Sequence, residues 1–208
     1  MNTLLSDWIA IIPAKGHSDA VQCKNLQILG DMPLFWHSVR YARAEGVTPV
    51  VSTDDPVIKR YALKRGCGVV DERVDDSSQA NCVRQVMEAI GSVRRYVILQ
   101  PTSPIRRPGL LSEIMAMEAP CVYTAQRIKV VGYLDGEMAV QLRRQDASRW
   151  LWQYDGAMLT GTRDMAQAGI LFTPDAVKVE QRAPYTLQID SAHDFNLMRV
   201  LYDYFHCR

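Results

Sequence analysis

Short apolar runs alternate with amphipathic helical patterns along most of this 208-residue chain, and that alternation restricts its possible folds more than any other feature. Strand-like runs occupy Trp8–Ala14, Thr48–Ser52, Cys67–Val70 and Tyr96–Gln100. A strand–helix–strand rhythm of this kind is typical of parallel βαβ units. The sequence therefore predicts an α/β fold, a Rossmann-like open, mostly parallel twisted sheet flanked by helices, as a single domain over residues 1–208.

Local signals place the helices between these runs. The first helix is expected from Pro33 to Ala44. The next is expected after Asp54-Asp55-Pro56, where a capping carboxylate precedes a proline, and it should stop at Gly66. The remaining predicted elements are helices over Ser78–Ile90 and Leu110–Met117 and a strand over Cys121–Ala125.

The βα rhythm stops at about Gln126, and we interpret residues 126–167 as an inserted arm. Asp135-Gly136, between two apolar runs, predicts a hairpin inside it. The main domain is expected to resume at Gly169–Phe172, followed by a strand over Tyr185–Ile189. Ser191 and Asp194 should cap a last helix. Its apolar positions recur at helical spacing: Leu197, Val200, Leu201, Tyr204 and Phe205.

Composition excludes several classes of protein. With 48% apolar residues the chain is not disordered, and a formal net charge of +1 gives no support for nucleic-acid or membrane binding. Residues Met1–Asp7 lack the features of a signal peptide, and no apolar stretch approaches the ~20 residues of a membrane span. A cytoplasmic location is expected. The five cysteines lack the C-x-x-C spacing of a zinc site.

The loop Lys15–Asn25 follows the first predicted strand and contains two lysines, a glycine and a serine. In open α/β sheets, ligands lie beyond the carboxyl ends of strands. Glycine lets backbone N–H groups approach an anion, and ammonium groups supply charge for a phosphate chain. The dinucleotide pattern G-x-G-x-x-G and the P-loop pattern are both absent here. The sequence therefore predicts a phosphate-binding loop of another type.

Two motifs, Ile12–Gly16 with Lys24-Asn25 and Leu99–Arg106, resemble those of the acylneuraminate cytidylyltransferases, which make CMP-activated sialic acids. Ile12–Gly16 followed by Lys24-Asn25 is similar to their I-P-A-R-G-G-S-K-x-x-P-x-K-N signature, and Leu99–Arg106 is similar to L-Q-P-T-S-P-L-R. Related enzymes that act on deoxy-octulosonate carry Q-G-D-E-P in place of the second motif. The Pro-Thr-Ser sequence of this chain therefore favours a nine-carbon sugar acid as acceptor. Weaker similarities to V-S-T-D-D and I-D-[ST]-x-x-D lie at Val51–Asp55 and Ile189–Asp194.

The resemblance implies a sheet of the nucleotide-diphospho-sugar transferase type and a reaction in which CTP gives CMP to an acidic sugar, with Mg²⁺ as cofactor. Lys15 and Lys24 would act on the triphosphate as catalytic residues. The predicted nucleotide-binding set is Ala14, Lys15, Gly16, Ser18, Lys24, Asn25, Arg73 and Ser77. The predicted acceptor-binding set is Gln100, Thr102 and Ser103. Such transfers depend on positioning and on neutralising phosphate charge.

Two departures from the family pattern concern the metal. The family has lysine where this chain has Asp19, and its I-D-I-D run, with two carboxylates on one strand face, is replaced here by Leu187–Asp190. Gln188 thus stands where a carboxylate is expected. Asp190 is the predicted metal ligand, and we hypothesise that Asp19 supplies the missing carboxylate. A separation above about 8 Å between the two carboxyls would exclude a shared ion.

The arm resembles the family's dimerisation segment, which implies a homodimer in which basic side chains of each arm reach the sugar pocket of the neighbouring subunit. The candidates are Arg127, Lys129, Arg143, Arg144 and Arg163. Two alternatives remain open. One is a cytidylyltransferase of the same fold for another acidic acceptor, such as a phosphonate, since Gln167–Leu171 departs from the family's N-G-A-I-Y segment. The other is a nucleotide-binding paralogue without turnover.

Overall fold

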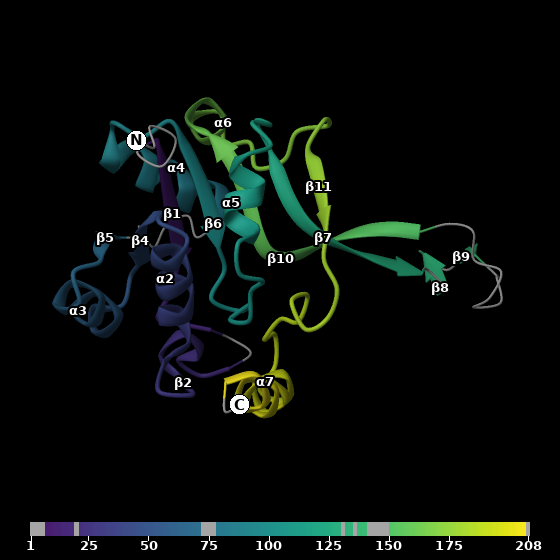
Figure 1. Ribbon diagram of the computed structural model, residues 1–208, viewed down its shortest axis with the longest axis horizontal. Helices are drawn as coiled ribbons and strands as arrows, with labels where there is room; N and C mark the ends of the chain where they lie inside the picture. Colours follow the sequence, from purple (N-terminus) through teal and green to yellow (C-terminus); the bar gives the residue numbers. More distant parts are fainter. Residues whose placement is uncertain are drawn as a thin grey trace.

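The computed structural model describes residues 7–18, 21–71, 78–129, 132–134, 137–140 and 150–206. Its centre is a seven-stranded sheet of order β11-β7-β10-β6-β1-β4-β5 (Figure 1). β10 runs antiparallel to both its neighbours, and every other pairing is parallel. These strands are β1 (Trp8–Pro13), β4 (Thr48–Thr53), β5 (Gly68–Asp71), β6 (Arg95–Leu99), β7 (Val122–Lys129), β10 (Trp150–Thr162) and β11 (Val177–Glu180). The predicted α/β class and mostly parallel sheet are confirmed.

Helices cover both faces of the sheet. The helices α2 (Leu34–Ala44), α3 (Pro56–Lys64) and α5 (Leu110–Met115) share one apolar cluster with Ala10 and Ile12 of β1. The helices α4 (Gln79–Ile90) and α6 (Arg163–Gln167) pack on the other face, with Ile9 and Ile11. Successive strand residues point to opposite faces, so an uninterrupted apolar run fits a strand buried on both.

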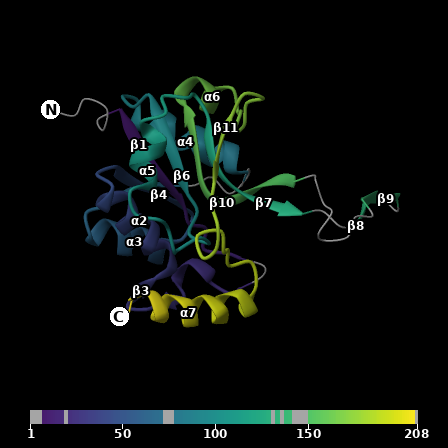
Figure 2. The same cartoon turned by 45° about the vertical axis from the view of Figure 1, so that its right-hand side comes forward.

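The carboxyl ends of the parallel strands face a separate layer. It contains η1 (Lys24–Leu26), β2 (Ile28–Leu29), β3 (Met32–Pro33) and α7 (Ala192–His206). Figures 1 and 2 show α7 lying across this end of the sheet, while α6 and the start of β1 lie at the opposite end. A third apolar cluster joins Leu29, Ile105, Ile189 and Met198. Segments far apart in the sequence therefore meet beyond the ends of the strands.

The predicted helix ends are confirmed by their caps. Asp55 Oδ1 accepts hydrogen bonds from the N–H groups of Val57 and Ile58 at 2.7 and 3.0 Å, with Pro56 at the first helical position of α3. Gly66 follows this helix with φ +66°, a conformation that glycine adopts without penalty. Ser191 and Asp194 form the predicted reciprocal cap of α7.

The arm is built on the outer parts of β7 and β10, which pair from Trp150↔Lys129 to Tyr154↔Ala125. β8 (Gly132–Leu134) and β9 (Glu137–Val140) form the predicted antiparallel hairpin, although its turn, Asp135-Gly136, lies outside the described residues. The predicted end of the arm at Gln167 is too late. Residues 158–162 pair with β6 in the central sheet, and α6 packs on α4.

The predicted strand at Tyr185–Ile189 is wrong. These residues form a turn followed by an irregular segment. The N–H of Tyr185 donates to the carbonyl of Arg182, and the N–H of Leu187 donates to the carbonyl of Pro184. The strand that the prediction missed is β11, which pairs in parallel with β7. β11 lies at the edge of the sheet and only Val179 is buried in it, so its apolar signal is weak.

Most of the apolar stripe predicted for α7 lies on the exposed face of the helix and not on the face packed against the protein. The side chains packed inward are Phe195, Met198 and Tyr202. Four of the predicted positions are instead 46–68% exposed: Leu197, Val200, Tyr204 and Phe205. The helix carries two apolar stripes, and the packing partners select one of them. No helix in the described ranges is long and apolar enough to cross a membrane.

Candidate active site at the carboxyl ends of the strands

The predicted phosphate loop is held from two sides where it leaves β1. Gly16 N–H donates to Asp54 Oδ1 at 2.7 Å, and Asn25 Nδ2 donates to the carbonyl of Lys15 at 2.8 Å. Ala14 is buried, and its N–H donates to the carbonyl of Ser52 at 2.8 Å. Asn25 was predicted to bind the nucleotide, and in this structure its amide N–H braces the loop.

Glycine is required at position 16 because the chain passes close to the start of α3. A Cβ atom at Gly16 would lie 2.7 Å from the Cβ of Asp55 and 2.6 Å from its Oδ2. No side chain fits at such distances without a shift of the loop. Lys15 and Ser18, on either side, are half-buried, so the loop presents both a cation and a hydroxyl at the end of β1.

Lys24 connects this loop to the segment before α7. Its Nζ donates to the carbonyl of Ile189 at 3.1 Å, and Ile189 N–H donates to the carbonyl of Thr102 at 2.9 Å. Asp190, the predicted metal ligand, is exposed beside this junction. The predicted phosphate loop, the turn after β6 that carries the predicted acceptor residues (called the acceptor turn below) and Asp190 are therefore brought together from three distant motifs.

The turn after β6 is tightly organised around Gln100. Ser103 N–H donates to the carbonyl of Gln100 at 3.1 Å, and Arg106 Nη2 donates to the same carbonyl at 2.6 Å. Gln100 and Thr102 are half-buried at this edge. Ser103, predicted to face the acceptor, has a fully buried side chain, because the turn folds it inward. Arg106 was not singled out by the sequence analysis, although it ends the second motif.

A buried carboxylate, which the sequence analysis missed, lies at the root of the arm. Asp155 is 2% exposed, and its Oδ1 accepts hydrogen bonds from Thr124 Oγ1 at 2.5 Å and from Ala157 N–H at 2.9 Å. Its Oδ2 accepts from Gln181 Nε2 at 3.1 Å. Burial raises the pKa of Asp155, and these hydrogen bonds oppose that rise. Asp155 thus ties β7, β10 and the residue after β11 together.

Gln188 has a structural role that a carboxylate would not fill. Its Nε2 donates to the backbone carbonyl of Asp155, and its amide occupies the space where a Cβ of Gly156 would lie. Gly156 has φ +74°, within the irregular stretch of β10 between Tyr154 and Leu159. An ionised Asp or Glu at position 188 has no N–H to donate. Gln188, at a position where the family pattern predicts a carboxylate, therefore anchors the root of the arm.

A family model described as Cytidylyltransferase matches residues 9–195. The chain belongs to this family. It is 22% identical over 216 residues to an N-acylneuraminate cytidylyltransferase of Streptococcus agalactiae, a match that covers 90% of this chain and 51% of the relative. It is 29% identical over 111 residues to the CMP-N,N'-diacetyllegionaminic acid synthase of Legionella pneumophila, covering 48% of each protein.

The fold agrees with this membership. The solved structure of a CMP:2-keto-3-deoxy-manno-octonic acid synthetase complexed with CTP superposes with a TM-score of 0.71 at 19% identity, covering 95% of this chain and 99% of the other. The chain spans about half the length of the curated relatives it matches.

Among the described residues, Asp190 is the predicted metal ligand, and its carboxylate is accessible. Asp190 is exposed, whereas Oδ2 of the nearby Asp194 already accepts hydrogen bonds from the backbone and hydroxyl of Ser191. No group of three His, Cys, Asp or Glu side chains within the described ranges is arranged to hold an ion. Mg²⁺ is often held by one or two carboxylates together with substrate phosphates, so Asp190 fits that role. Asp19, Arg73 and Ser77 lie outside the described residues, and the proposed Asp19–Asp190 distance is not tested.

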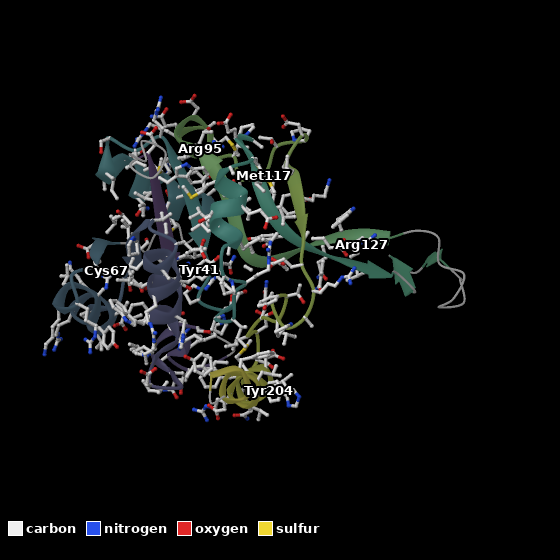
Figure 3. The ribbon with its side chains drawn as sticks, viewed as in Figure 1. Tyr41, Cys67, Arg95, Met117, Arg127 and Tyr204 are labelled. Atoms are coloured by element: carbon white, nitrogen blue, oxygen red, sulfur yellow. The ribbon has the colours of Figure 1, made fainter. Side chains whose placement is uncertain are left out.

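Two of the basic candidates of the arm have other partners. Arg127, on the stem of the arm (Figure 3), pairs with Glu180 at 2.9 Å. Arg163 donates to the carbonyls of Val93 and Met87, at the end of the sheet away from the site. Within its own subunit, Arg163 therefore lies away from the predicted acceptor residues. The side chain of Lys129, and residues Arg143 and Arg144, lie outside the described part.

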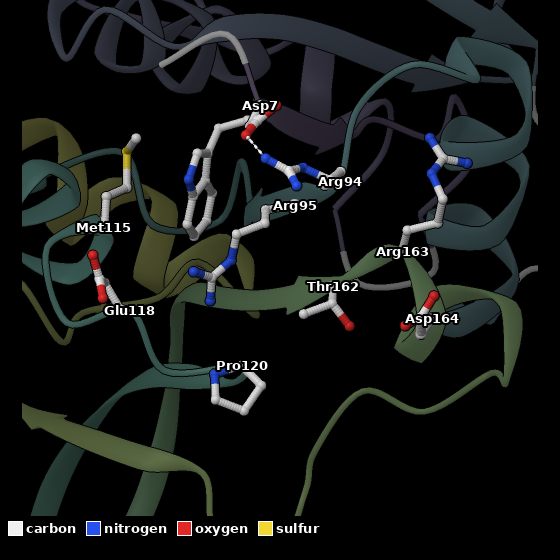
Figure 4. Close-up of a pocket in the computed structure, with 10 residues that line it drawn as sticks. Asp7, Arg94, Arg95, Met115, Glu118, Pro120, Thr162, Arg163 and Asp164 are labelled. Carbon is white, nitrogen blue, oxygen red and sulfur yellow. Dashed lines mark hydrogen bonds and ion pairs between the residues drawn. The ribbon is translucent and has the colours of Figure 1, made fainter. Parts of the chain in front are cut away.

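A pocket of about 650 Å³ lies at that far end of the sheet (Figure 4). It is lined by three arginines and three carboxylates, and Arg94 pairs with Asp7 at 2.5 Å. Its lining charges balance, and Arg163 is its one residue among the predicted acceptor or nucleotide contacts. The active site of a cytidylyltransferase is therefore better sought at the carboxyl ends of the strands.

Proposed function

We propose that this protein transfers CMP from CTP to the anomeric hydroxyl of a nonulosonic, sialic-like acid and releases pyrophosphate. The observation that carries the proposal is the junction at Ile189. The carbonyl of Ile189 accepts from Lys24 of the loop, and its N–H donates to Thr102 of the Gln100–Thr102 turn. Asp190 is the next residue in the chain. The residues proposed to bind the donor and those proposed to bind the acceptor are thus adjacent. Family membership and the names of two relatives support the donor and the acceptor class.

The residues of the loop would lower the barrier by meeting phosphate charge. The acceptor oxygen attacks the α-phosphorus while the bond to the β-phosphate breaks, so negative charge grows on the leaving pyrophosphate. Lys15, Lys24 and the backbone around Gly16 would stabilise that charge. Mg²⁺, held by Asp190 and the phosphate oxygens, would neutralise further charge.

The acceptor sugar would be bound at the turn after β6. The half-buried side chains of Gln100 and Thr102 can hydrogen-bond sugar hydroxyls, and the turn is fixed by Arg106 and by Ile189 N–H. This fixed geometry favours positioning of a polar substrate.

We also propose that the protein acts as a homodimer through its arm. On the arm and the adjoining edge of the sheet, Trp152 is 41% exposed and Phe172 is 43% exposed. Phe172 packs edge-on against Tyr123 and Tyr154, with ring centroids 5.4 Å apart in each pair. Exposed aromatic side chains such as Trp152 and Phe172 are enriched at protein–protein interfaces.

An eight-carbon acid is a second candidate acceptor, because the CTP-bound synthetase that shares this fold is a 2-keto-3-deoxy-manno-octonic acid enzyme. A non-catalytic nucleotide-binding protein is a third candidate, because Gln188 replaces a carboxylate. A phosphonate acceptor would use the same transfer of CMP from CTP, and only the molecule that receives CMP would differ.

Pyrophosphate release separates these candidates. CTP, UTP and ATP would each be incubated with Mg²⁺ and with N-acetylneuraminate, a legionaminate, 2-keto-3-deoxy-manno-octonate or a phosphonate. We expect release only with CTP and a nine-carbon acid. Pyrophosphate release with only the eight-carbon acid, or with only the phosphonate, would identify that compound as the acceptor in place of a nine-carbon acid. Saturable CTP binding without release from any acceptor would favour the non-catalytic protein.

A further inference from the structure

A second pocket lies behind the acceptor turn, between α2, residues 104–108 and α7. Its volume is about 470 Å³, within the range of small-molecule sites. Its walls include the rings of Tyr41 and Tyr202 and the side chains of two prolines, Pro104 and Pro108. No function described above uses this pocket.

Two arginines line it, and neither forms an ion pair with a described carboxylate. Arg106 is 7% exposed; its Nη1 donates to Ser38 Oγ at 3.1 Å, its Nη2 donates to the carbonyl of Gln100, and its Nε has no acceptor among the described residues. Arg40 is exposed, and its described hydrogen bond goes to the Sδ of Met32 at 3.7 Å. Thioether sulfur is a weak acceptor.

The charge in this pocket is not compensated by its own lining. The larger pocket at the far end of the sheet sets three carboxylates against three arginines, whereas none of the residues around this one is acidic. A buried cation without a close counter-charge is costly. Burial accordingly lowers the pKa of Arg106 to about 10, although Tyr41 and Asp155 nearby act in the opposite direction.

We propose that this pocket is a second anion site, in which Arg40 and Arg106 bind a small oxyanion, the phosphate or carboxylate group of a metabolite. Guanidinium groups match such anions with paired hydrogen bonds. The site is separate from the phosphate loop, yet Arg106 also holds the carbonyl of Gln100. An occupant would therefore lie one side chain away from the acceptor turn.

Calorimetric titration of the full chain with inorganic phosphate and with citrate, at constant ionic strength, tests the proposal. The titrations would be made in a Lys24→Met background, so that the phosphate loop contributes little. Arg40→Gln is the test variant. Arg43→Gln is its control, because Arg43 leaves the same helix one turn later and donates to the carbonyls of Arg65 and Gly66.

We expect saturable binding of at least one of the two anions, retained in Arg43→Gln and weakened at least about tenfold in Arg40→Gln, equivalent to about 1.4 kcal/mol. Binding of phosphate alone or of citrate alone identifies which group the pocket prefers. In NMR spectra of the Lys24→Met protein, the ring signals of His37 and Tyr202 should shift with the same saturation.

The proposal fails if neither anion gives saturable heat. It also fails if Arg40→Gln and Arg43→Gln bind equally well, or if binding seen in the wild-type protein disappears with Lys24→Met. None of these outcomes depends on turnover, so they leave the proposed function to its own test.

Discussion

At the residue scale, Lys24 has two tasks, since its ammonium group orders the junction at Ile189 and lies in the predicted triphosphate site. The Lys24→Met variant should lower kcat/KM by about a hundredfold, because one charge that stabilises the transition state is lost, about 3 kcal/mol. Steady-state pyrophosphate release measures this change. Lys64→Met is the control, which removes the same charge from the end of α3. Equal activities of the two variants would contradict the role of Lys24.

Asp155 is the residue for which a dependence on pH is expected. In the unfolded chain its carboxyl loses its proton at the ordinary pKa, but in the folded protein burial raises that pKa. Between the two values the folded state binds more protons, so this group makes the free energy of unfolding fall as pH rises, and the loss is complete above the raised pKa.

The Asp155→Asn variant should lack this dependence. Gln181 Oε1 is buried without a described partner, so a flip of that amide would let it accept from the new Asn Nδ2. The stability of the variant relative to the wild-type protein should therefore increase from about pH 4 to neutrality. Urea denaturation across that range measures the difference. A constant difference at all pH values would show that the pKa of Asp155 is not raised.

At the element scale, two neighbouring carboxylates at the end of β4 have different tasks. Asp55 caps α3, so Asp55→Ala should lower the free energy of unfolding by about 1 kcal/mol. Asp54 accepts from Gly16 N–H, so Asp54→Ala should loosen the phosphate loop and raise KM for CTP roughly tenfold, at about 1.4 kcal/mol. Thermal denaturation and steady-state kinetics of both variants distinguish these effects. The assignment is wrong if both variants lose stability equally with KM unchanged.

The elements also show where local patterns succeed. The caps of α3 and α7 are read correctly because each is a hydrogen bond between residues two to four positions apart. β11 is missed because an edge strand with one buried residue lacks a clear apolar period. The inward stripe of α7 is misassigned because the helix carries apolar residues on two faces, and Leu29, Leu34 and Ile105 select one of them.

At the scale of the whole molecule, the arm and α7 both expose apolar side chains, and only one of them is proposed as the dimer contact. Light scattering should give the mass of a dimer. Trp152→Glu on the arm should shift the protein toward monomer, because a charge in the interface would be desolvated. Val200→Glu, on the 68% exposed face of α7, should not. If Val200→Glu gave monomer and Trp152→Glu did not, the interface would be assigned to α7. A monomeric wild-type protein would contradict the dimer proposal.

The α/β class, the positions of most helices and the place of the predicted phosphate loop at the end of β1 could all be predicted from the sequence. These follow from apolar periodicity and from contacts between near neighbours, which a linear pattern contains. Only the tertiary structure decided that Ser103 is buried, that Gln188 anchors the arm, and that Arg106 and Asp155 support the site. Each of these depends on the packing of residues far apart in the chain, and no local pattern encodes which distant side chain will satisfy a buried polar group.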